Sequence, residues 1–551
     1  MTPRPHVLIV GAAGVFGSRL ARLLAHRRAF RISLGGRAAA HVSALQRELR
    51  EIDEQAEFAF VAIDRETIGA ERLKEMRCNL VVDCSGPFQL AGTRLIEAAV
   101  AARCDYLDLA DSRAFVAGIA RFDAAARAVG VSLLSGASTT PCLTHAILDH
   151  LTSAWLTVDT IDVAIVPGNR TPKGKAVVSA ILSWVGQRVP VFREAEWQEG
   201  WGWGDPTTIS IDGLGRRRVR LADVPDLDLL ATRYEPRVRA WLGAGMELPV
   251  MNACIALAGW PVRHRFIRSA GVFSGVGYRL ARLLDNFGTD TGGMLIEVAG
   301  QDARGVPKVA RWTLRARKGH GPFVPVAPAA ALVVAMLLGR GVLPGARPAV
   351  GILSLEHVRA MFEGLEIETS LTAYKGERPL FRRLLGEQFD GLPEVTRRLH
   401  RGRPAIVATG EALLAPADTW LGRFLARRFG LPAIDGRVPV RVVIESRGGQ
   451  EYWTRVFDRT PMRSSMAPAG EGLIEERFGA LAVTMRLVAR SDGLDMVPVS
   501  ARWHGIPLPR ALLPQVRAEE RVDGGGRHRF DVEISVPFVG RLVAYRGYLV
   551  L

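Results

Sequence analysis

The first 150 residues alternate short apolar runs with longer segments that are rich in Ala, Leu and Arg. The apolar runs cover residues 6–10, 30–34, 58–64, 79–85, 106–110 and 131–136. Apolar strands that alternate with helices are typical of a parallel sheet that is buried on both faces. The pattern therefore predicts a doubly wound α/β domain over residues 1–150.

The pattern changes between residues 151 and 370. Runs at 160–166, 293–300 and 309–318 alternate apolar and polar positions, which predicts an α+β domain with a more open sheet. The longest apolar run, residues 329–338, is shorter than the roughly 20 residues that span a bilayer. We expect a core helix there and no transmembrane segment.

The last region, residues 375–551, contains a series of strand-like runs at 439–446, 481–489, 530–536 and 542–551. Glycine-rich turns such as Gly448-Gly449 separate these runs. The region predicts a C-terminal, mainly antiparallel β domain with some helix, either a sheet or a partial barrel.

Composition and charge narrow the class of protein. With 551 residues the chain is too long for one core, and 48% hydrophobic residues are typical of ordered globular domains. The net charge of +16 comes mostly from arginines that are spread along the chain. Because no nucleic-acid motif accompanies them, they predict a preference for anionic ligands and no nucleic-acid partner.

The cysteines and the N-terminus bear on the compartment. The five cysteines form no CxxC pair, and the chain enters its first strand almost at once, without a signal peptide. Both features favour a reducing, cytoplasmic setting. The sequence predicts no metal site and leaves the oligomeric state open.

A glycine pattern, GxxGxxG, follows the first strand directly. The first glycine allows a tight turn, the second lets the backbone approach a pyrophosphate, and the third permits close packing of helix on strand. The start of the next helix then faces the phosphates with its positive end. This is the pattern of a Rossmann dinucleotide site, and the residues that we expect at the cofactor are Gly11, Ala13, Gly14, Val15, Phe16 and Gly17.

The residue after the second strand bears on the type of nucleotide. NAD sites usually place an acid there to hold the ribose 2′-hydroxyl, whereas this chain has Arg37, whose guanidinium matches a 2′-phosphate. NADP is therefore favoured, and NAD stays open if Arg37 only covers the adenine. Asp64 ends the third strand, where its carboxylate would either accept a hydrogen bond from the adenine amino group or cap the next helix, from Glu66 onward.

The fourth strand ends in Ser85-Gly86-Pro87-Phe88, at the sheet edge where open α/β folds bind ligands. Gly86 would permit close approach of the nicotinamide ribose, and Phe88 would wall the nicotinamide ring. A plain turn between strand and helix is the alternative.

Five stretches together resemble the saccharopine dehydrogenase-like family: GAAGVFGSRLARLL, LGGR, VVDCSGPFQLAG, CDYLDLAD and SGASTTPCLTHAIL. The resemblance covers residues 5–370 and is strongest in the first 150. It implies an NAD(P)-dependent oxidoreductase with a Rossmann domain and an α+β domain that covers the cleft. The family's range of substrates leaves the substrate unidentified.

Two catalytic candidates come from this resemblance. Asp108 matches an aromatic-x-Asp element at a strand end, as acid, base or substrate anchor. His145 ends the element PCLTH, in which Cys142 and Thr144 replace the Gly and Asp of saccharopine-forming members, so we expect a different substrate. His145 would donate a proton as hydride arrives, or would be a structural histidine in the first turn of a helix.

Short-chain dehydrogenases share the glycine pattern but need a Tyr followed four residues later by Lys. None of the seven tyrosines has that Lys. This excludes the short-chain class and leaves the saccharopine dehydrogenase-like interpretation.

The C-terminal region resembles a domain of unknown function that is found fused behind such chains. Its aromatic and basic side chains would either line a pocket for an acidic ligand or lie on the sheet surface, and the surface position is favoured. These residues are Trp453, Arg455, Trp503, His504 and Arg529. The helix at 420–432 would pack on the core, with weak membrane-surface association as the alternative.

The function that we predict is hydride transfer between NADP(H) and a small molecule that is held between the first two domains. Two alternatives remain. One is a non-catalytic NADP-binding scaffold or ligand-binding protein, and the other is a membrane-associated lipid enoyl reductase.

Overall fold

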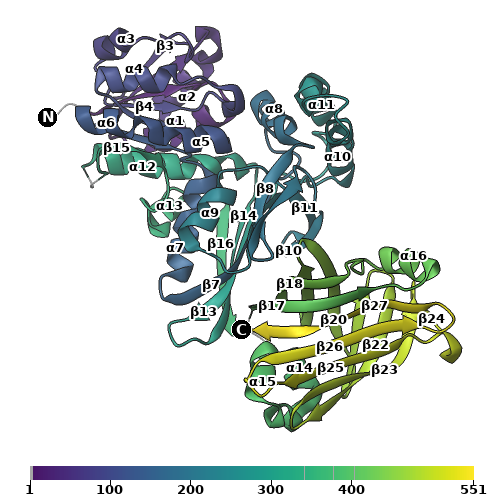
Figure 1. Cartoon of the computed structure of the whole chain (residues 1–551). Coiled ribbons are helices and arrows are strands. Elements are labelled where there is room, and N and C mark those ends of the chain that lie inside the picture. The colour runs from purple at the N-terminus through teal and green to yellow at the C-terminus, as the bar shows by residue number, and fades with distance from the viewer. Residues whose placement is uncertain (1–3, 340–341, 376–377, 402–403) are drawn as a thin grey trace.

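The computed structural model describes residues 4–339, 342–375, 378–401 and 404–551. Their strands form three sheets (Figure 1), which are parallel, mixed and antiparallel in turn. This agrees with the predicted order of a Rossmann domain, an α+β domain and a β-rich C-terminal domain. In Figure 1 the middle sheet lies between the other two.

The first sheet has the strand order β15-β6-β5-β4-β1-β2-β3, and every pair in it is parallel. Its strands are β1 (His6–Val10), β2 (Arg31–Gly36), β3 (Phe58–Ala62), β4 (Leu80–Asp83), β5 (Asp105–Asp108), β6 (Ser132–Ser135) and β15 (Gly345–Pro348). Its helices are α1 (Val15–His26), α2 (Ser43–Ile52), α3 (Ala70–Met76), α4 (Arg94–Ala102), α5 (Arg113–Gly118) and α6 (Asp123–Val129). The order reverses between β1 and β4, which is the point where doubly wound sheets bind ligands.

The chain returns to the first sheet late. The apolar run at 329–338 forms α12 (Ala327–Leu337), which is buried as expected and packs against α1. β15 then pairs with β6 at the sheet edge. α12 and β15, which the sequence pattern assigns to the middle domain, therefore lie against the first one, because α12 buries its apolar surface there.

The middle sheet has the order β10-β11-β12-β7-β13-β14-β16, with β8 bridging β12 and β9. Its strands are β7 (Trp155–Val166), β8 (Arg188–Arg193), β9 (Glu196–Trp201), β10 (Thr207–Ile211), β11 (Gly215–Leu221), β12 (Arg239–Ala244), β13 (Gly292–Asp302), β14 (Pro307–Ala316) and β16 (Ile367–Lys375). Its helices are α7 (Thr144–Thr152), α8 (Lys175–Trp184), α9 (Asp226–Tyr234), α10 (Pro249–Arg263), α11 (Ser274–Leu283) and α13 (Leu355–Arg359). Figure 1 shows α8, α10 and α11 grouped together beyond one end of this sheet.

The third sheet closes on itself through the pairing of β22 with β23. Its strands are β17 (Ala405–Pro416), β18 (Gly436–Arg447), β19 (Gln450–Phe457), β20 (Thr460–Gly470), β21 (Leu473–Phe478), β22 (Leu481–Arg490), β23 (Gly493–Trp503), β24 (Ile506–Pro507), β25 (Gln515–Val522), β26 (His528–Val536) and β27 (Gly540–Val550). Its helices are α14 (Leu380–Leu385), α15 (Glu394–Leu399) and α16 (Trp420–Arg428). The predicted sheet or partial barrel is thus a closed barrel, to which β24 adds a short edge pairing.

A buried ion pair joins the barrel to the middle domain. The Arg239 guanidinium lies 2.6 Å from an Asp162 carboxylate oxygen and also pairs with Glu445 of β18. Val238, Ala405 and Val443 form a small apolar cluster beside it. Within the described residues, no helix is long and apolar enough to cross a membrane.

Candidate functional site

The glycine loop has the geometry that the sequence predicts. Gly11 has a φ of +79°, and the amides of Gly11 and Ala12 donate to the carbonyl of Gly35 at 3.0 and 3.1 Å. A β-carbon at Gly17 would lie only 2.3 Å from the carbonyl oxygen of Gly11. The first glycine therefore makes the turn, and the third brings α1 onto the end of β1.

The N-terminus of α1 is open to solvent. Gly14 caps it in an extended conformation, and the first turn contains no acidic residue. Ala13 and Gly14 are exposed, and Val15 and Phe16 are half-buried. Amides in the first turn of a helix lack intrahelical partners and carry partial positive charge, so this end of α1 is suited to a pyrophosphate.

Arg37 and Asp64 lie at the ends of the neighbouring strands. Arg37 follows β2, is exposed, and makes no hydrogen bond or ion pair with any residue that the structure describes. Its guanidinium is therefore free to meet a ligand. Asp64 accepts a hydrogen bond from the Glu66 amide at 2.9 Å, so its carboxylate caps a turn. The predicted helix from Glu66 onward is wrong, because α3 begins at Ala70.

The SGPF turn lies directly against the glycine loop. A β-carbon at Gly11 would be 3.0 Å from the α-carbon of Ser85. Ser85, Gly86 and Pro87 are half-buried, whereas Phe88 is only 5% exposed and packs on Phe115 with ring centroids 5.3 Å apart. The Phe88 ring thus anchors the turn in the domain core, and the backbone of Cys84 and Ser85 faces the loop.

A buried pair that the sequence analysis missed holds this turn. Arg65 Nη1 lies 2.9 Å from an oxygen of Asp83, whose side chain is fully buried. The other Asp83 oxygen accepts from the amide and hydroxyl of Ser85, at 2.9 and 2.5 Å. The Arg65 guanidinium also lies 5.0 Å from the centroid of Phe88. The sequence signal that could have indicated this pair is an acidic residue, Asp83, at the end of the apolar strand VVD.

Asp108 lies beside Asp83 in the strand register but has different partners. One of its oxygens accepts hydrogen bonds from the amides of Gly136 and Ala110, at 2.8 and 2.9 Å, and from the Ser135 hydroxyl at 3.0 Å. Burial outweighs these bonds and raises the pKa of Asp108 to about 6. The carboxylate thus ties the end of β5 to the end of β6.

His145 is fully buried in α7 and faces α9. Its Nδ1 lies 2.8 Å from the Pro141 carbonyl oxygen and 3.9 Å from an Asp226 oxygen, and its ring packs 5.5 Å from Tyr234. Burial lowers the pKa of His145 to about 4 and raises that of Asp226 to about 8. Both groups are therefore neutral at pH 7. Burial also raises the pKa of Cys142 to about 12, so its thiol is protonated.

The middle domain approaches the start of α1 through two segments. A β-carbon at Gly174 would lie 3.7 Å from Val15 Cγ2, so the loop that follows β7 touches the first residue of α1. Residues 321–326 pack along the same helix, with the Arg19 guanidinium 5.4 Å from the Phe323 ring centroid. The sequence analysis did not predict this second contact.

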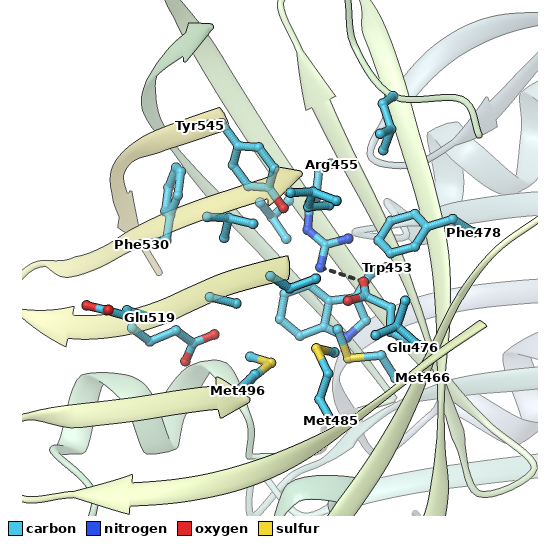
Figure 2. Close-up of a pocket in the computed structure, with 18 of the residues that line it drawn as sticks. Trp453, Arg455, Met466, Glu476, Phe478, Met485, Met496, Glu519, Phe530 and Tyr545 are labelled. Atoms are coloured by element: carbon cyan, nitrogen blue, oxygen red, sulfur yellow. Dashed lines mark hydrogen bonds and ion pairs between the residues drawn. The ribbon is translucent and has the colours of Figure 1, made fainter. Parts of the chain in front are cut away.

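The barrel interior contains a paired charge (Figure 2). Arg455 Nη2 lies 3.1 Å from Glu476, its Nη1 lies 2.9 Å from the Ser464 hydroxyl, and its guanidinium lies 4.8 Å from the Trp453 ring centroid. The cavity here is about 80 Å³, well below the roughly 300–1,000 Å³ of ligand pockets. The interior is thus a packed core. Trp503, His504 and Arg529, named with these residues in the sequence analysis, are exposed.

The helix that the sequence places at 420–432 is α16. Its Gly422 and Ala426 are buried and its Leu421 and Leu425 half-buried, whereas Trp420 and Phe424 are 73% and 63% exposed. The helix therefore packs on the core through small residues and leucines, and its two aromatic side chains face solvent.

The chain matches two families. Residues 7–142 match the saccharopine dehydrogenase NADP binding domain, and residues 392–549 match a domain of unknown function, DUF4166. These matches confirm both predicted resemblances and show that the first domain binds a pyridine nucleotide. No curated protein sequence matches the chain.

Several solved structures are similar to about two thirds of the chain. GenD2 from gentamicin A biosynthesis, in complex with NAD, is 16% identical with a TM-score of 0.31, over 66% of this chain and 93% of that one. A probable dehydrogenase from Thermotoga maritima is 10% identical with a TM-score of 0.33, over 65% and 93%. The putative oxidoreductase YvaA from Bacillus subtilis is 11% identical with a TM-score of 0.29, over 66% and 93%.

Proposed function

We propose that the protein is an NADP-dependent oxidoreductase, because residues 7–142 match the saccharopine dehydrogenase NADP binding domain. It moves a hydride between the cofactor and a small molecule that is held between the first two domains. The observation that carries this proposal is the meeting of the open α1 terminus with the SGPF turn, opposite the loop that ends at Gly174. Hydride chemistry is supplied by the nicotinamide, and the protein supplies binding and orientation.

The choice of NADP rests on Arg37. Its exposed guanidinium follows β2, where the ribose of a dinucleotide lies in this fold, and it has no partner among the described residues. A guanidinium offers several donors to a 2′-phosphate, whereas NADH has no group there that needs them.

Each segment of the cleft has a separate task. The amides of residues 13–16 hold the pyrophosphate, and the backbone of Ser85 and Gly86 borders the nicotinamide ribose. The Gly174 loop and residues 321–326 exclude water above α1. Exclusion of water favours hydride transfer because it removes competing reactions and strengthens local electrostatics.

Catalytic roles for Asp108 and His145 stay predictions, and their contacts support positioning roles. Asp108 fastens two strand ends beside the SGPF turn. His145 is enclosed between α7 and α9, fully buried and neutral. Asp108→Asn and His145→Gln test this, with kcat, KM and the pH profile as readouts. A proton-transfer role requires loss of a limb of the pH profile in kcat at unchanged NADPH affinity, whereas a positioning role changes KM and stability.

Turnover itself is tested with NADPH that carries deuterium at the transferred position. The purified chain is incubated with this cofactor and a metabolite extract, and small molecules that gain deuterium are identified by mass spectrometry. We expect transfer to one class of acceptor. Tight NADPH binding with no deuterium transfer to any acceptor would instead identify a non-catalytic NADP-binding scaffold.

A further inference from the structure

An exposed apolar surface lies on α10, α11 and the turn between them, which we call the α10–α11 face. Six large apolar side chains here are each 53% to 74% exposed: Leu257, Trp260, Phe266, Val272, Val276 and Leu283. Soluble monomers rarely expose apolar patches larger than a few hundred Å², and larger ones usually mark interaction sites. This concentration within less than forty residues indicates a docking surface.

The charged side chains within the segment that forms this face have one sign, and Asp285, which follows the segment, pairs with Arg282 and Lys173. Residues 249–284 contain no Asp or Glu, and they contain five arginines: Arg263, Arg265, Arg268, Arg279 and Arg282. Arg265, Arg268 and Arg279 make no ion pair or hydrogen bond through their side chains with any described residue. Unpaired arginines beside exposed apolar groups are typical of protein surfaces that bind anionic membranes.

A cavity of about 410 Å³ opens behind the face, within the roughly 300–1,000 Å³ range of small-molecule pockets. Its walls come from α8, α10 and α11 and are almost wholly apolar. Leu257 and Val276 belong both to its lining and to the exposed face, so the cavity opens on that face.

Two polar side chains of the loop that follows β7, Thr171 and Lys173, also line the cavity. The Lys173 ammonium lies 2.8 Å from an Asp285 carboxylate oxygen. The Thr171 methyl group would lie 3.7 Å from a β-carbon at Gly321, and the same loop touches Val15 of α1 at Gly174. This loop therefore links the wall of the cavity to the segments that lie beside the start of α1.

We propose that the α10–α11 face docks on an anionic lipid bilayer and that the cavity behind it receives the acyl chain of a membrane lipid. The docking stands independently, whereas the identity of this lipid as the substrate rests on the proposed function. Lys173, in the wall of the cavity, would face the headgroup. A second copy of the chain fits the face poorly, because self-association would bring Arg265, Arg268 and Arg279 of one copy against the same arginines of the other.

Docking is tested by flotation of the full chain with phosphatidylcholine vesicles that contain about one-third phosphatidylserine. One triple variant removes apolar side chains from the face and combines Leu257→Ser, Val276→Ser and Leu283→Ser. A second triple variant removes positive charge and combines Arg265→Gln, Arg268→Gln and Arg279→Gln. Phe538→Ser, at a 93% exposed residue of the barrel, is the apolar control. The control for the arginine triple is a variant of the barrel domain with the same change of net charge, which combines Arg459→Gln, Arg486→Gln and Arg546→Gln.

We expect the wild type and both controls to float with the vesicles at low salt. Since each arginine near such a surface contributes about 1 kcal/mol, the arginine triple should lower the partition constant about 100-fold. The apolar triple should stay at the bottom of the gradient. Docking is refuted if the wild type does not float or if the triples float like their controls. A wild-type dimer that only the apolar triple dissociates would assign the face to self-association instead.

Occupancy of the cavity is tested at Cys254, which lines it and is half-buried. Alkylation by a small maleimide is followed by peptide mass spectrometry, with dodecanoate as the probe and Cys254→Ser as the control. Dodecanoate should slow labelling of Cys254 at least tenfold and leave Cys84 unchanged; equal rates would refute the acyl site. If NADPH fails to bind while flotation and protection persist, the proposed function fails and the docking surface stands.

Discussion

The carbonyl oxygen of Gly11 occupies the space that a side chain at Gly17 would need, 2.3 Å from the position of its β-carbon. The other nearest atoms, Ala12 Cα and Gly11 C, also belong to the backbone, at 2.8 and 2.9 Å. No rotation of a flexible side chain relieves these contacts. The packing of α1 on β1 therefore requires a residue without a side chain at position 17. The approach of the α1 N-terminus to the pyrophosphate depends on this packing.

Gly17→Ala should therefore shift α1 away from the loop. We expect a loss of about 1–3 kcal/mol in the free energy of unfolding, which is typical of overpacking, together with weaker NADPH binding. Gly275→Ala in α11 is the matched control, because no atom lies within 4 Å of its β-carbon position. That control should gain stability, by about 0.5–1 kcal/mol. Unchanged stability and affinity in Gly17→Ala would contradict the packing role.

Arg65 and Asp83 should behave as a coupled pair. Arg65→Leu leaves the buried Asp83 carboxylate without its cation, so we expect a loss of about 3–5 kcal/mol in stability. Asp83→Asn in the Arg65→Leu background should recover part of this loss, because the amide carries no charge. Urea unfolding of the single and double variants measures the coupling. Additive effects would show that the two residues act independently.

The buried Asp226 makes stability depend on pH with a defined sign. Its pKa is about 8 in the folded state, against about 4 in an unfolded chain. Between these values the folded state holds a proton that the unfolded chain has lost, so stability falls as pH rises. His145 does not interfere above pH 7, where it is neutral in both states.

Asp226→Asn should remove this dependence. Between pH 7 and pH 8 the variant should gain about 1 kcal/mol relative to wild type, as measured by urea unfolding at each pH. Asp435→Asn, at an exposed position of the barrel domain, should follow the wild-type pH dependence. Parallel curves for wild type and Asp226→Asn would show that Asp226 is charged in the folded state.

The elements that the sequence predicts best are those whose signal is local. The strands of the first sheet and the roles of Gly11 and Gly17 follow from spacing along one strand, turn and helix. Closure of the barrel through β22 and β23, and the return of β15 to the first sheet, depend on pairings between distant segments. A period of two in the hydrophobic pattern predicts a strand and does not identify its neighbour.

The candidate site divides in the same way. Arg37 and the SGPF turn follow from their position after strands. The burial of Phe88 depends on Phe115 and Arg65, and that of His145 on Asp226 and Tyr234, which come from other elements. The α10–α11 face was missed for a related reason, because apolar composition alone does not tell a buried helix side from an exposed one.

The most direct measurement is the affinity of NADPH and NADH for the wild type and for Arg37→Ala. We predict that the wild type binds NADPH at least about tenfold more tightly, as expected for hydrogen bonds between charged groups, and that the variant loses this preference while its NADH affinity stays the same. Equal affinity of the wild type for both nucleotides, or a preference that survives Arg37→Ala, would contradict the assignment of this cleft to NADP.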